Sequence, residues 1–120
     1  MPYLRIETNI PSDKIPKDLP SKLCNIVASS LGKPIGYCVA TIVGDVNMSW
    51  GGTNEPAAQA TLMSIGALGR NENKKHSKAI FEAVGKELGV PNDRMYITFS
   101  NVKSEDVGYN GTTFHDIFGS

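Results

Sequence analysis

The sequence predicts an α/β protein: a four-stranded mixed sheet with two helices packed on one of its faces. The hydrophobic patterns run in the order strand, helix, strand, and the same order then occurs a second time. Leu31-Gly32-Lys33-Pro34 also matches Leu88-Gly89-Val90-Pro91 at an offset of 57 positions (31 to 88). Two right-handed β-α-β units in tandem place both helices on the same face of one sheet. The 120 residues fit one domain over 1–120.

The first unit begins with a strand over residues 3–8, where apolar and polar side chains alternate. A helix is predicted from Leu19, because Pro20 suits a first turn and Gly32 suits the position just after the last turn. Its apolar stripe consists of Leu19, Leu23, Ile26, Val27 and Leu31. Residues 37–43 (YCVATIV) form a β-rich run that completes the unit.

The second unit repeats this order with a strand over 59–65, a helix over 72–88 and a strand over 95–99. The apolar face of this helix contains Ile80, Phe81, Val84 and Leu88. His76 is expected on its solvent-exposed surface. A short strand is predicted over 107–109, followed by a turn at Asn110-Gly111.

The second face of the predicted sheet has no helix to cover it. It still carries an apolar group, because Tyr3 stands beside Arg5 and Glu7 on that side of the first strand. An apolar surface of this kind favours burial by a partner subunit.

Composition excludes several classes of function. Twelve basic residues balance twelve acidic ones, so no basic surplus points to a nucleic-acid partner. No apolar stretch has the length of a membrane span, and residues 1–20 lack the apolar core of a signal peptide. No phosphate-binding, dinucleotide-binding or metal-binding motif occurs, so neither a cofactor nor a metal is expected. Cys24 and Cys38 are interpreted as reduced core thiols in a cytosolic protein.

The remaining candidate for chemistry is Pro2. Proline is a small residue behind Met1, so removal of the methionine is expected, and Pro2 then becomes a secondary amine at the start of a strand. Partial burial and a nearby ammonium, for which Lys33 is a candidate, would both lower the pKa of this amine. A neutral amine at physiological pH is a competent general base. The alternative interpretation is that Pro2 is merely the residue that follows the initiator.

Seven short motifs occur in a specific order and spacing from Met1 to about Phe114. They are Met1-Pro2-Tyr3, Thr8-Asn9-Ile10-Pro11, Leu31-Gly32-Lys33-Pro34, Gly51-Gly52-Thr53-Asn54-Glu55-Pro56-Ala57, Ser64-Ile65-Gly66, Asn92-Asp93-Arg94-Met95-Tyr96-Ile97 and Val107-Gly108-Tyr109-Asn110-Gly111-Thr112-Thr113-Phe114. Through them the chain resembles the macrophage migration inhibitory factor and D-dopachrome tautomerase family. The resemblance implies a ferredoxin-like double β-α-β subunit that assembles as a homotrimer, with active sites at the subunit interfaces.

The resemblance also implies a role for each site residue. Pro2 matches the catalytic base, Lys33 matches the lysine that binds the substrate carboxylate, and Ile65, with Ser64 beside it, matches a backbone donor to substrate. The implied pocket walls are Tyr37, Tyr96, Thr98, Val107, Tyr109 and Phe114. Tyr96 would come from the neighbouring subunit. Without this resemblance, the alternative interpretation is that Lys33 stabilises the carboxyl end of the first helix, where cations are favoured. Tyr37 and Tyr96 would then be ordinary aromatic residues of strands.

The implied activity is keto–enol tautomerisation of a small aromatic α-keto acid such as phenylpyruvate, or of D-dopachrome, without a cofactor. The alternative is a cytokine-like binding protein with a vestigial pocket, which engages a cell-surface receptor. The expected location is the cytoplasm, with secretion by a route that needs no signal peptide. Thr98 replaces a family asparagine, Tyr109 replaces a tryptophan, and Ser12 replaces an arginine linked to receptor binding. Residues 115–120 form a short C-terminal extension, in which Ile117 and Phe118 either pack near a subunit interface or belong to a disordered tail.

Overall fold

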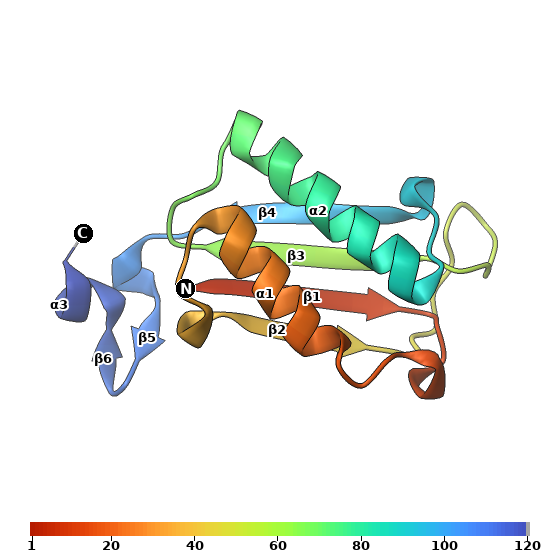
Figure 1. The fold of residues 1–120 in the computed structure, drawn as a ribbon, viewed down its shortest axis with the longest axis horizontal. Helices are drawn as coiled ribbons and strands as arrows, with labels where there is room; N and C mark the ends of the chain where they lie inside the picture. Colours follow the sequence, from red (N-terminus) through yellow and green to blue (C-terminus); the bar gives the residue numbers. More distant parts are fainter. Residues whose placement is uncertain (120) are drawn as a thin grey trace.

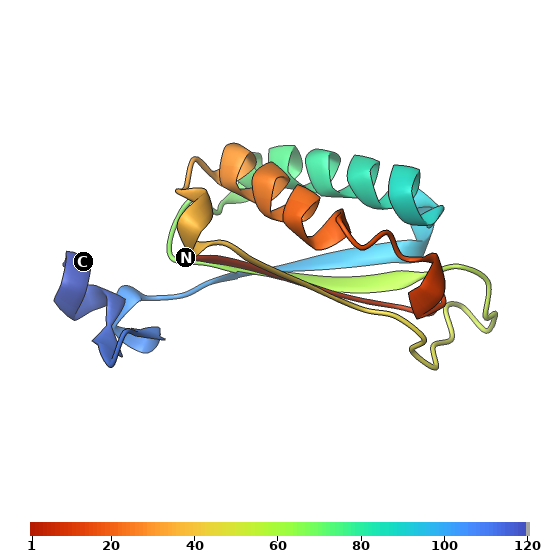
Figure 2. The ribbon, with the colours of Figure 1, turned by 60° about the horizontal axis from the view of Figure 1, so that its bottom comes forward.

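A computed structural model describes residues 1–119 and confirms the predicted fold class (Figure 1). One four-stranded sheet has the order β2-β1-β3-β4, in which β1 runs parallel to β2 and antiparallel to β3, and β3 runs parallel to β4. Both long helices cover the same face of this sheet (Figures 1 and 2). The elements are β1 (Pro2–Thr8), α1 (Leu19–Leu31), β2 (Val39–Val43), β3 (Ala58–Ser64), α2 (Arg70–Leu88), β4 (Met95–Asn101), β5 (Gly108–Tyr109), β6 (Thr112–Thr113) and α3 (Phe114–Phe118).

The core lies between the helices and the covered face of the sheet. Alternate residues of β1, including Leu4 and Ile6, are fully buried, and Leu62 of β3 lies opposite Leu4. From α1, Leu19, Leu23 and Val27 pack against them, as the predicted stripe requires. Burial of each such aliphatic side chain stabilises the fold by about 1.5–3 kcal/mol. The central strand β1 is thereby fixed, and Pro2 is its first residue.

Both helices end at a glycine in the left-handed conformation, at Gly32 (φ 67°) and Gly89 (φ 71°). Each glycine N–H donates to a carbonyl of the last helical turn, at Ala28 and Gly85 respectively. A residue without a side chain adopts this conformation at little cost, which explains the repeated Leu-Gly motif. Because α1 is closed by Gly32, Lys33 is the first residue beyond the helix end, and this end of α1 lies at the same end of the molecule as the start of β1 (Figure 1).

Tyr37 does not lie in a strand, contrary to the prediction of a strand over 37–43. Residues Ile35–Tyr37 form a single 3₁₀ turn, and β2 begins only at Val39. The N–H of Tyr37 donates to Pro34 and that of Cys38 to Ile35, so local bonds replace sheet bonds here. The turn leaves Tyr37 at the end of the sheet rather than on its face.

The predicted short strand and turn near residue 110 are confirmed. β5 and β6 form a two-stranded hairpin around Asn110 (φ 54°) and Gly111 (φ 84°). Positive φ at both central residues is the requirement of the tight hairpin turn that Asn-Gly favours. The hairpin and α3 project beyond the end of the main sheet (Figure 2).

His76 is buried, and its prediction as a surface residue is wrong. The side chain is 1% exposed and lies on the face of α2 that also carries Ile80, Val84 and Leu88 at intervals of four residues. Its Nε2 donates to the carbonyl of Ala67 at 2.9 Å, so in the neutral ring Nδ1 accepts from the Ser30 hydroxyl at 2.6 Å. The polar ring is tolerated because both nitrogens are paired, and it joins α2 to α1.

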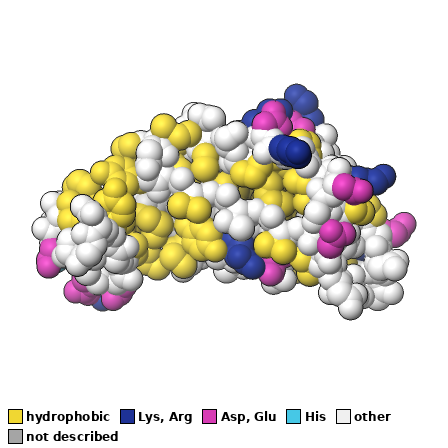
Figure 3. Space-filling view, turned by 90° about the horizontal axis from the view of Figure 1, so that it is seen from below, with side chains coloured by type: hydrophobic (Ala, Val, Ile, Leu, Met, Phe, Trp, Pro, Cys, Tyr) yellow, Lys and Arg dark blue, Asp and Glu magenta, His cyan; other side chains and the backbone are white. Residues whose placement is uncertain are grey.

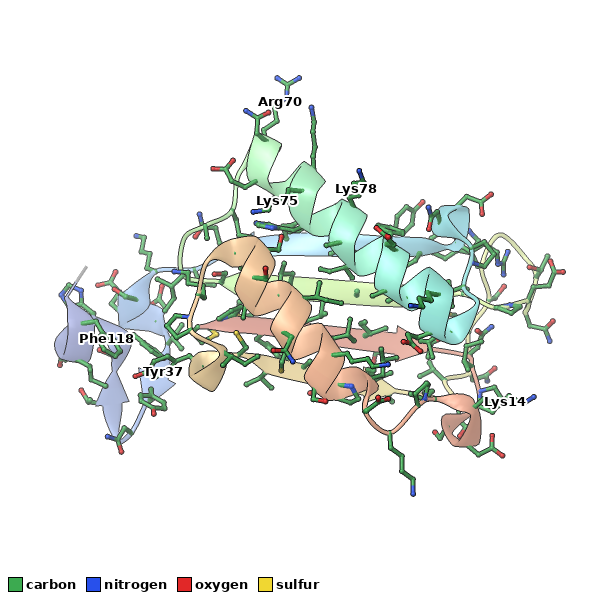
Figure 4. All side chains as sticks on the ribbon, in the orientation of Figure 1. Lys14, Tyr37, Arg70, Lys75, Lys78 and Phe118 are labelled. Atoms are coloured by element: carbon green, nitrogen blue, oxygen red, sulfur yellow. The ribbon has the colours of Figure 1, made fainter. Side chains whose placement is uncertain are left out.

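Replacing His76 by alanine is expected to lower the free energy of unfolding by about 2–4 kcal/mol. The change leaves a cavity between the helices and removes the partner of two polar groups. Denaturant unfolding at a fixed protein concentration measures the loss. Lys78→Ala, on the exposed side of the same helix (Figure 4), should change stability by less than about 0.5 kcal/mol. Equal effects of the two substitutions would contradict the structural role of His76.

The two cysteines are free thiols, but both are only half-buried rather than part of the core. Cys24 contacts the carbonyl of Cys38, and Cys38 contacts that of Pro34, so both lie beside the turn that carries Tyr37. Burial raises the pKa of the Cys38 thiol. The thiol form is therefore favoured, and weak S–H contacts hold this corner of the fold.

The other face of the sheet is open, as predicted. Along the β2 edge, Ile35 and Val39 are about half exposed, and apolar side chains form a broad band across the view from below (Figure 3). Tyr3, half-buried on β1, pairs with Val39 on this face. Within residues 1–119 no helix combines the length and apolar character needed to cross a membrane.

Candidate active site

A pocket of about 320 Å³ lies at the end of the sheet where β1 begins. Since β1 and β3 are antiparallel and Pro2 pairs with Ser64, the amino end of β1 and the carboxyl end of β3 meet there. Lys33 enters from the end of α1. The pocket is lined by Met1, Lys33, Pro34, Tyr37, Ile65, Ser104, Phe114, Phe118 and Gly119.

Lys33 joins the end of α1 to the end of β3. Its Nζ donates to the carbonyl of Ile65 at 2.9 Å, and its backbone N–H, not its side chain, bonds the Ala28 carbonyl in the last turn of α1. The side chain therefore points into the pocket instead of stabilising the helix end. This geometry favours the ligand-binding interpretation of Lys33 over the helix-capping one.

The N-terminal amine lies in the same pocket. Burial lowers the pKa of this amine below its ordinary value, the Lys33 ammonium lowers it further, and Cys38 acts in the opposite direction. In the chain that retains Met1 the amine belongs to that residue, which is half-buried. Pro2 behind it is fully buried. An amine carried by Pro2 would therefore lie deeper than the one in this structure.

Two predicted wall residues, Tyr37 and Phe114, line one side of the pocket with their aromatic rings. Tyr37 meets Phe114 edge to face, with ring centroids 5.9 Å apart, and Tyr109 stacks on Phe114 at 5.1 Å. Tyr109 also meets Tyr37 at 5.6 Å, so it supports the wall from outside the lining residues. Val107 does not line the pocket either, but its carbonyl accepts a hydrogen bond from the N–H of Phe114 at 3.0 Å. Such aromatic contacts are worth roughly 0.5–1.5 kcal/mol each beyond area burial.

Ser64 is fully buried next to Pro2 in the strand register. Among residues 1–119, its hydroxyl oxygen has no hydrogen-bond partner within the chain. An unpaired buried hydroxyl costs about 1–3 kcal/mol, so a group beside it would be favoured to bond it. Ser64 pairs with Pro2 in the register, but it shares the buried side of β3 with Ala60 and Leu62 and is not one of the residues that line the pocket.

Tyr96 and Thr98 do not reach this pocket within one chain. Tyr96 pairs with Gln59, which pairs with Glu7, five residues along β1 from Pro2. At 3.3 Å per residue this amounts to roughly 17 Å. Tyr96 is 67% exposed and packs only on Trp50 among the aromatic rings of the described chain, at 4.6 Å. Thr98 is likewise exposed, on the open face.

Five lining residues are not among the predicted site residues: Met1, Pro34, Ser104, Phe118 and Gly119. The signal for Phe118 is its position four residues after Phe114, which places both rings on one side of a helical turn. The sequence predicts only interface packing or a disordered tail for residues 115–120, of which residue 120 lies outside the described residues. The structure places residues Phe114–Phe118 in α3 instead.

Other surfaces of the described chain present fewer groups suited to catalysis than the pocket at the start of β1. A larger groove of about 520 Å³ runs between α1 and α2, where Lys22 forms ion pairs with Asp18 and Glu87 at the surface. Hydrogen bonds to Glu87 and Asp18 raise the pKa of Lys22, which favours the protonated form of its amine. No group of three or more histidine, cysteine, aspartate or glutamate side chains in the described part of the chain is arranged to hold a metal ion.

The fold is thus a double β-α-β subunit, and its candidate site is an N-terminal amine in a pocket walled by aromatic rings and a lysine. The chain belongs to the macrophage migration inhibitory factor family, whose family model matches residues 1–115. The macrophage migration inhibitory factor homolog of Trichinella spiralis is 43% identical over 114 residues, which cover 95% of this chain and all of that protein. The Mus musculus factor is 35% identical over 95% of this chain and 99% of its own length.

Solved structures agree with this assignment. The structure of the Trichinella spiralis factor matches with a TM-score of 0.90 at 40% identity, covering 92% of this chain and 98% of that one. The homologue from Prochlorococcus marinus matches with a TM-score of 0.87 at 32% identity, covering 93% and 98%. The fold is therefore that of the family from one end of the match to the other.

Proposed function

We propose that this protein is a keto–enol tautomerase that uses Pro2, exposed as an N-terminal amine after removal of Met1, as its general base. The observation that carries the proposal is the N-terminal amine in the pocket, carried here by Met1, whose pKa is lowered by burial and by Lys33. The proposed substrate class is a small aromatic α-keto acid, of which phenylpyruvate is the simplest probe. Membership of the family supports the reaction class.

The reaction follows from the groups in the pocket. The neutral Pro2 nitrogen removes a proton from the carbon next to the keto group and becomes a secondary ammonium. The carbonyl oxygen then takes a proton from this ammonium, directly or through water, which gives the enol and restores the neutral amine. The same transfers in reverse order convert the enol into the ketone. Lys33 pairs with the carboxylate of the substrate as a point charge. Tyr37 and Phe114 contact the substrate ring and keep water away from the base, which favours its neutral form.

We further propose that a working site needs a neighbouring copy of the chain, in a homotrimer. Tyr96 and Thr98 lie on the open sheet face, far along the sheet from their own Pro2. An adjacent subunit that covers this face would bring its own Tyr96 toward the pocket of the first. The exposed apolar residues of the β2 edge give such an interface a reason to form.

A second candidate function is a cytokine-like binding role, favoured by the relatives that carry the name macrophage migration inhibitory factor. In this proposal the protein acts at a cell-surface receptor after leaving the cytoplasm by a route without a signal peptide. A variant whose Pro2 nitrogen is blocked separates the two functions. Receptor binding would survive the block, whereas tautomerisation would not.

The test of the first proposal is the absorbance change of enol–keto interconversion in phenylpyruvate, measured with protein whose intact mass shows that Met1 is absent. Turnover above the buffer rate by the processed chain supports the proposal. Absence of turnover by a processed, oligomeric chain would rule it out.

Lys33→Met is expected to raise KM for phenylpyruvate about tenfold or more, because a charge-assisted bond to the carboxylate is lost. It should also move the acidic limb of the kcat/KM profile to higher pH. Removing the ammonium removes one cause of the lowered pKa, so the amine becomes protonated, and inactive as a base, at a higher pH than in the unaltered protein.

The matched control is Lys14→Met, a lysine in a 3₁₀ turn at the opposite end of the molecule (Figure 4). It should change neither KM nor the pH profile. A Lys33 variant with the KM and pH profile of the unaltered protein would contradict the proposed role of Lys33.

A further inference from the structure

The segment that follows the family match folds back onto the pocket. The family model ends at residue 115, yet α3 runs to Phe118. Thr113 accepts a hydrogen bond from the N–H of Asp116 at 3.2 Å, and the N–H of Gly119 donates to His115 at 2.7 Å. These bonds close both ends of a short helix. The segment is therefore a defined turn rather than an extended tail.

A second contact holds this turn against the body of the protein. Ser104, in the 3₁₀ turn Ser104–Asp106, donates its hydroxyl to the carbonyl of Gly119 at 3.3 Å. Both Ser104 and Gly119 line the pocket. The end of α3 is consequently tied to one rim of the site.

Phe118 extends the aromatic wall of the pocket. Its ring meets Tyr37 edge to face at 5.9 Å and stacks on Phe114 at 5.6 Å (Figure 4 labels Tyr37 and Phe118). The ring is nevertheless 59% exposed, so these two contacts use only part of its surface. The same pocket contains Lys33 and the N-terminal residue. The pocket therefore combines a cation with an aromatic ring whose surface is still partly exposed. This combination suits a ligand that has a carboxylate at one end and a flat ring at the other.

We propose that Phe118 is a substrate-contacting residue of this pocket and that residues 116–119 make the site selective for aromatic over small aliphatic α-keto acids. This inference rests on the proposed tautomerase function. Phe118 binds the substrate ring by stacking, so its contribution appears in binding and hardly at all in proton transfer. A purely structural role, in which Phe118 only covers Tyr37, would instead affect all substrates alike.

The experiment compares Phe118→Ala with Ile117→Ala, a neighbouring apolar residue of α3 that does not line the pocket. For phenylpyruvate, Phe118→Ala should raise KM about tenfold with kcat nearly unchanged, as loss of one ring contact predicts. For pyruvate, KM and kcat should stay the same. Phe118→Tyr should restore the KM for phenylpyruvate, and Ile117→Ala should resemble the unaltered protein.

A binding measurement keeps this inference separate from the catalytic one. The probe is 3-phenylpropanoate, which has the ring and carboxylate but no keto group, titrated by calorimetry. Phe118→Ala should weaken its Kd about tenfold, and thermal unfolding of the variant should match the unaltered protein. Suppose that phenylpyruvate is not turned over, but the probe binds and Phe118→Ala weakens its binding. The tautomerase proposal then fails, whereas the proposal that Phe118 binds the ring of the ligand is retained. If Phe118→Ala leaves Kd and KM unchanged, or weakens pyruvate and phenylpyruvate equally, the inference about Phe118 is overturned. If the probe does not bind the unaltered protein, it is overturned as well.

Discussion

Blocking the Pro2 nitrogen is expected to reduce kcat/KM for phenylpyruvate by about 10²- to 10⁴-fold, the usual contribution of a positioned general base. The variant inserts one alanine between Met1 and Pro2. After the methionine is removed, the nitrogen of Pro2 belongs to a peptide bond. An amide nitrogen is not basic, so every side chain of the pocket is kept while the secondary amine of Pro2 is lost. The primary amine of the inserted alanine takes the position that Met1 has in this structure, one residue away from the proposed base.

The control for this insertion is binding of 3-phenylpropanoate, which needs the pocket but no base. The Kd of the variant should remain within about threefold of that of the unaltered protein. This change is smaller than the roughly tenfold weakening expected when one contact with the ligand is lost. Pro2→Gly gives an intermediate case, because it retains an amine but loses the ring that fixes the nitrogen at the start of β1. Full activity in both variants would contradict the role assigned to Pro2.

The fold could be predicted because the sequence features that specify its helices and strands are local and periodic. The stripe from Leu19 to Leu31 and the glycines at 32 and 89 specify two helices without reference to the rest of the chain. Pairing of the units then follows from the handedness of β-α-β connections. The polarity of His76 predicts a surface residue, whereas its position four residues before Ile80 places it on the buried face of α2. What makes it a core residue is the pair of acceptor and donor groups that Ser30 and Ala67 supply.

The site was only partly predictable for a similar reason. Lys33, Ile65 and Phe114 stand in recognisable motifs, and the structure brings them together. Phe118 lies outside those motifs. Its role depends on the direction in which α3 runs after Thr113, and the hydrophobic periodicity of the sequence does not specify that direction. Tyr37 was assigned to a strand because it heads a β-rich run. The turn at Ile35–Tyr37 depends on bonds to Pro34 and Ile35 that a pattern of hydrophobicity does not show.

Tyr96 tests the proposed assembly most directly. The strand register puts it roughly 17 Å along the sheet from Pro2 of its own chain, so a single chain cannot use both groups on one small substrate. In a shared site, Pro2 of one subunit works with Tyr96 of the next. Tyr96→Ala alone is expected to raise KM for phenylpyruvate by at least about tenfold, as loss of an aromatic contact requires.

Refolding two impaired chains together is then expected to restore activity. One chain carries the alanine insertion before Pro2, and the other carries Tyr96→Ala. In mixed trimers formed at equal concentrations, about a quarter of the sites combine an intact Pro2 with an intact Tyr96. At phenylpyruvate concentrations well below KM, the rate should rise to about a quarter of that of the unaltered protein. In the control, the insertion chain is replaced by a chain that carries both the insertion and Tyr96→Ala. Neither chain of this mixture has an intact Tyr96, so activity should not recover. Recovery in neither mixture, or a monomer in sedimentation at micromolar concentration, would show that the site is not shared between subunits.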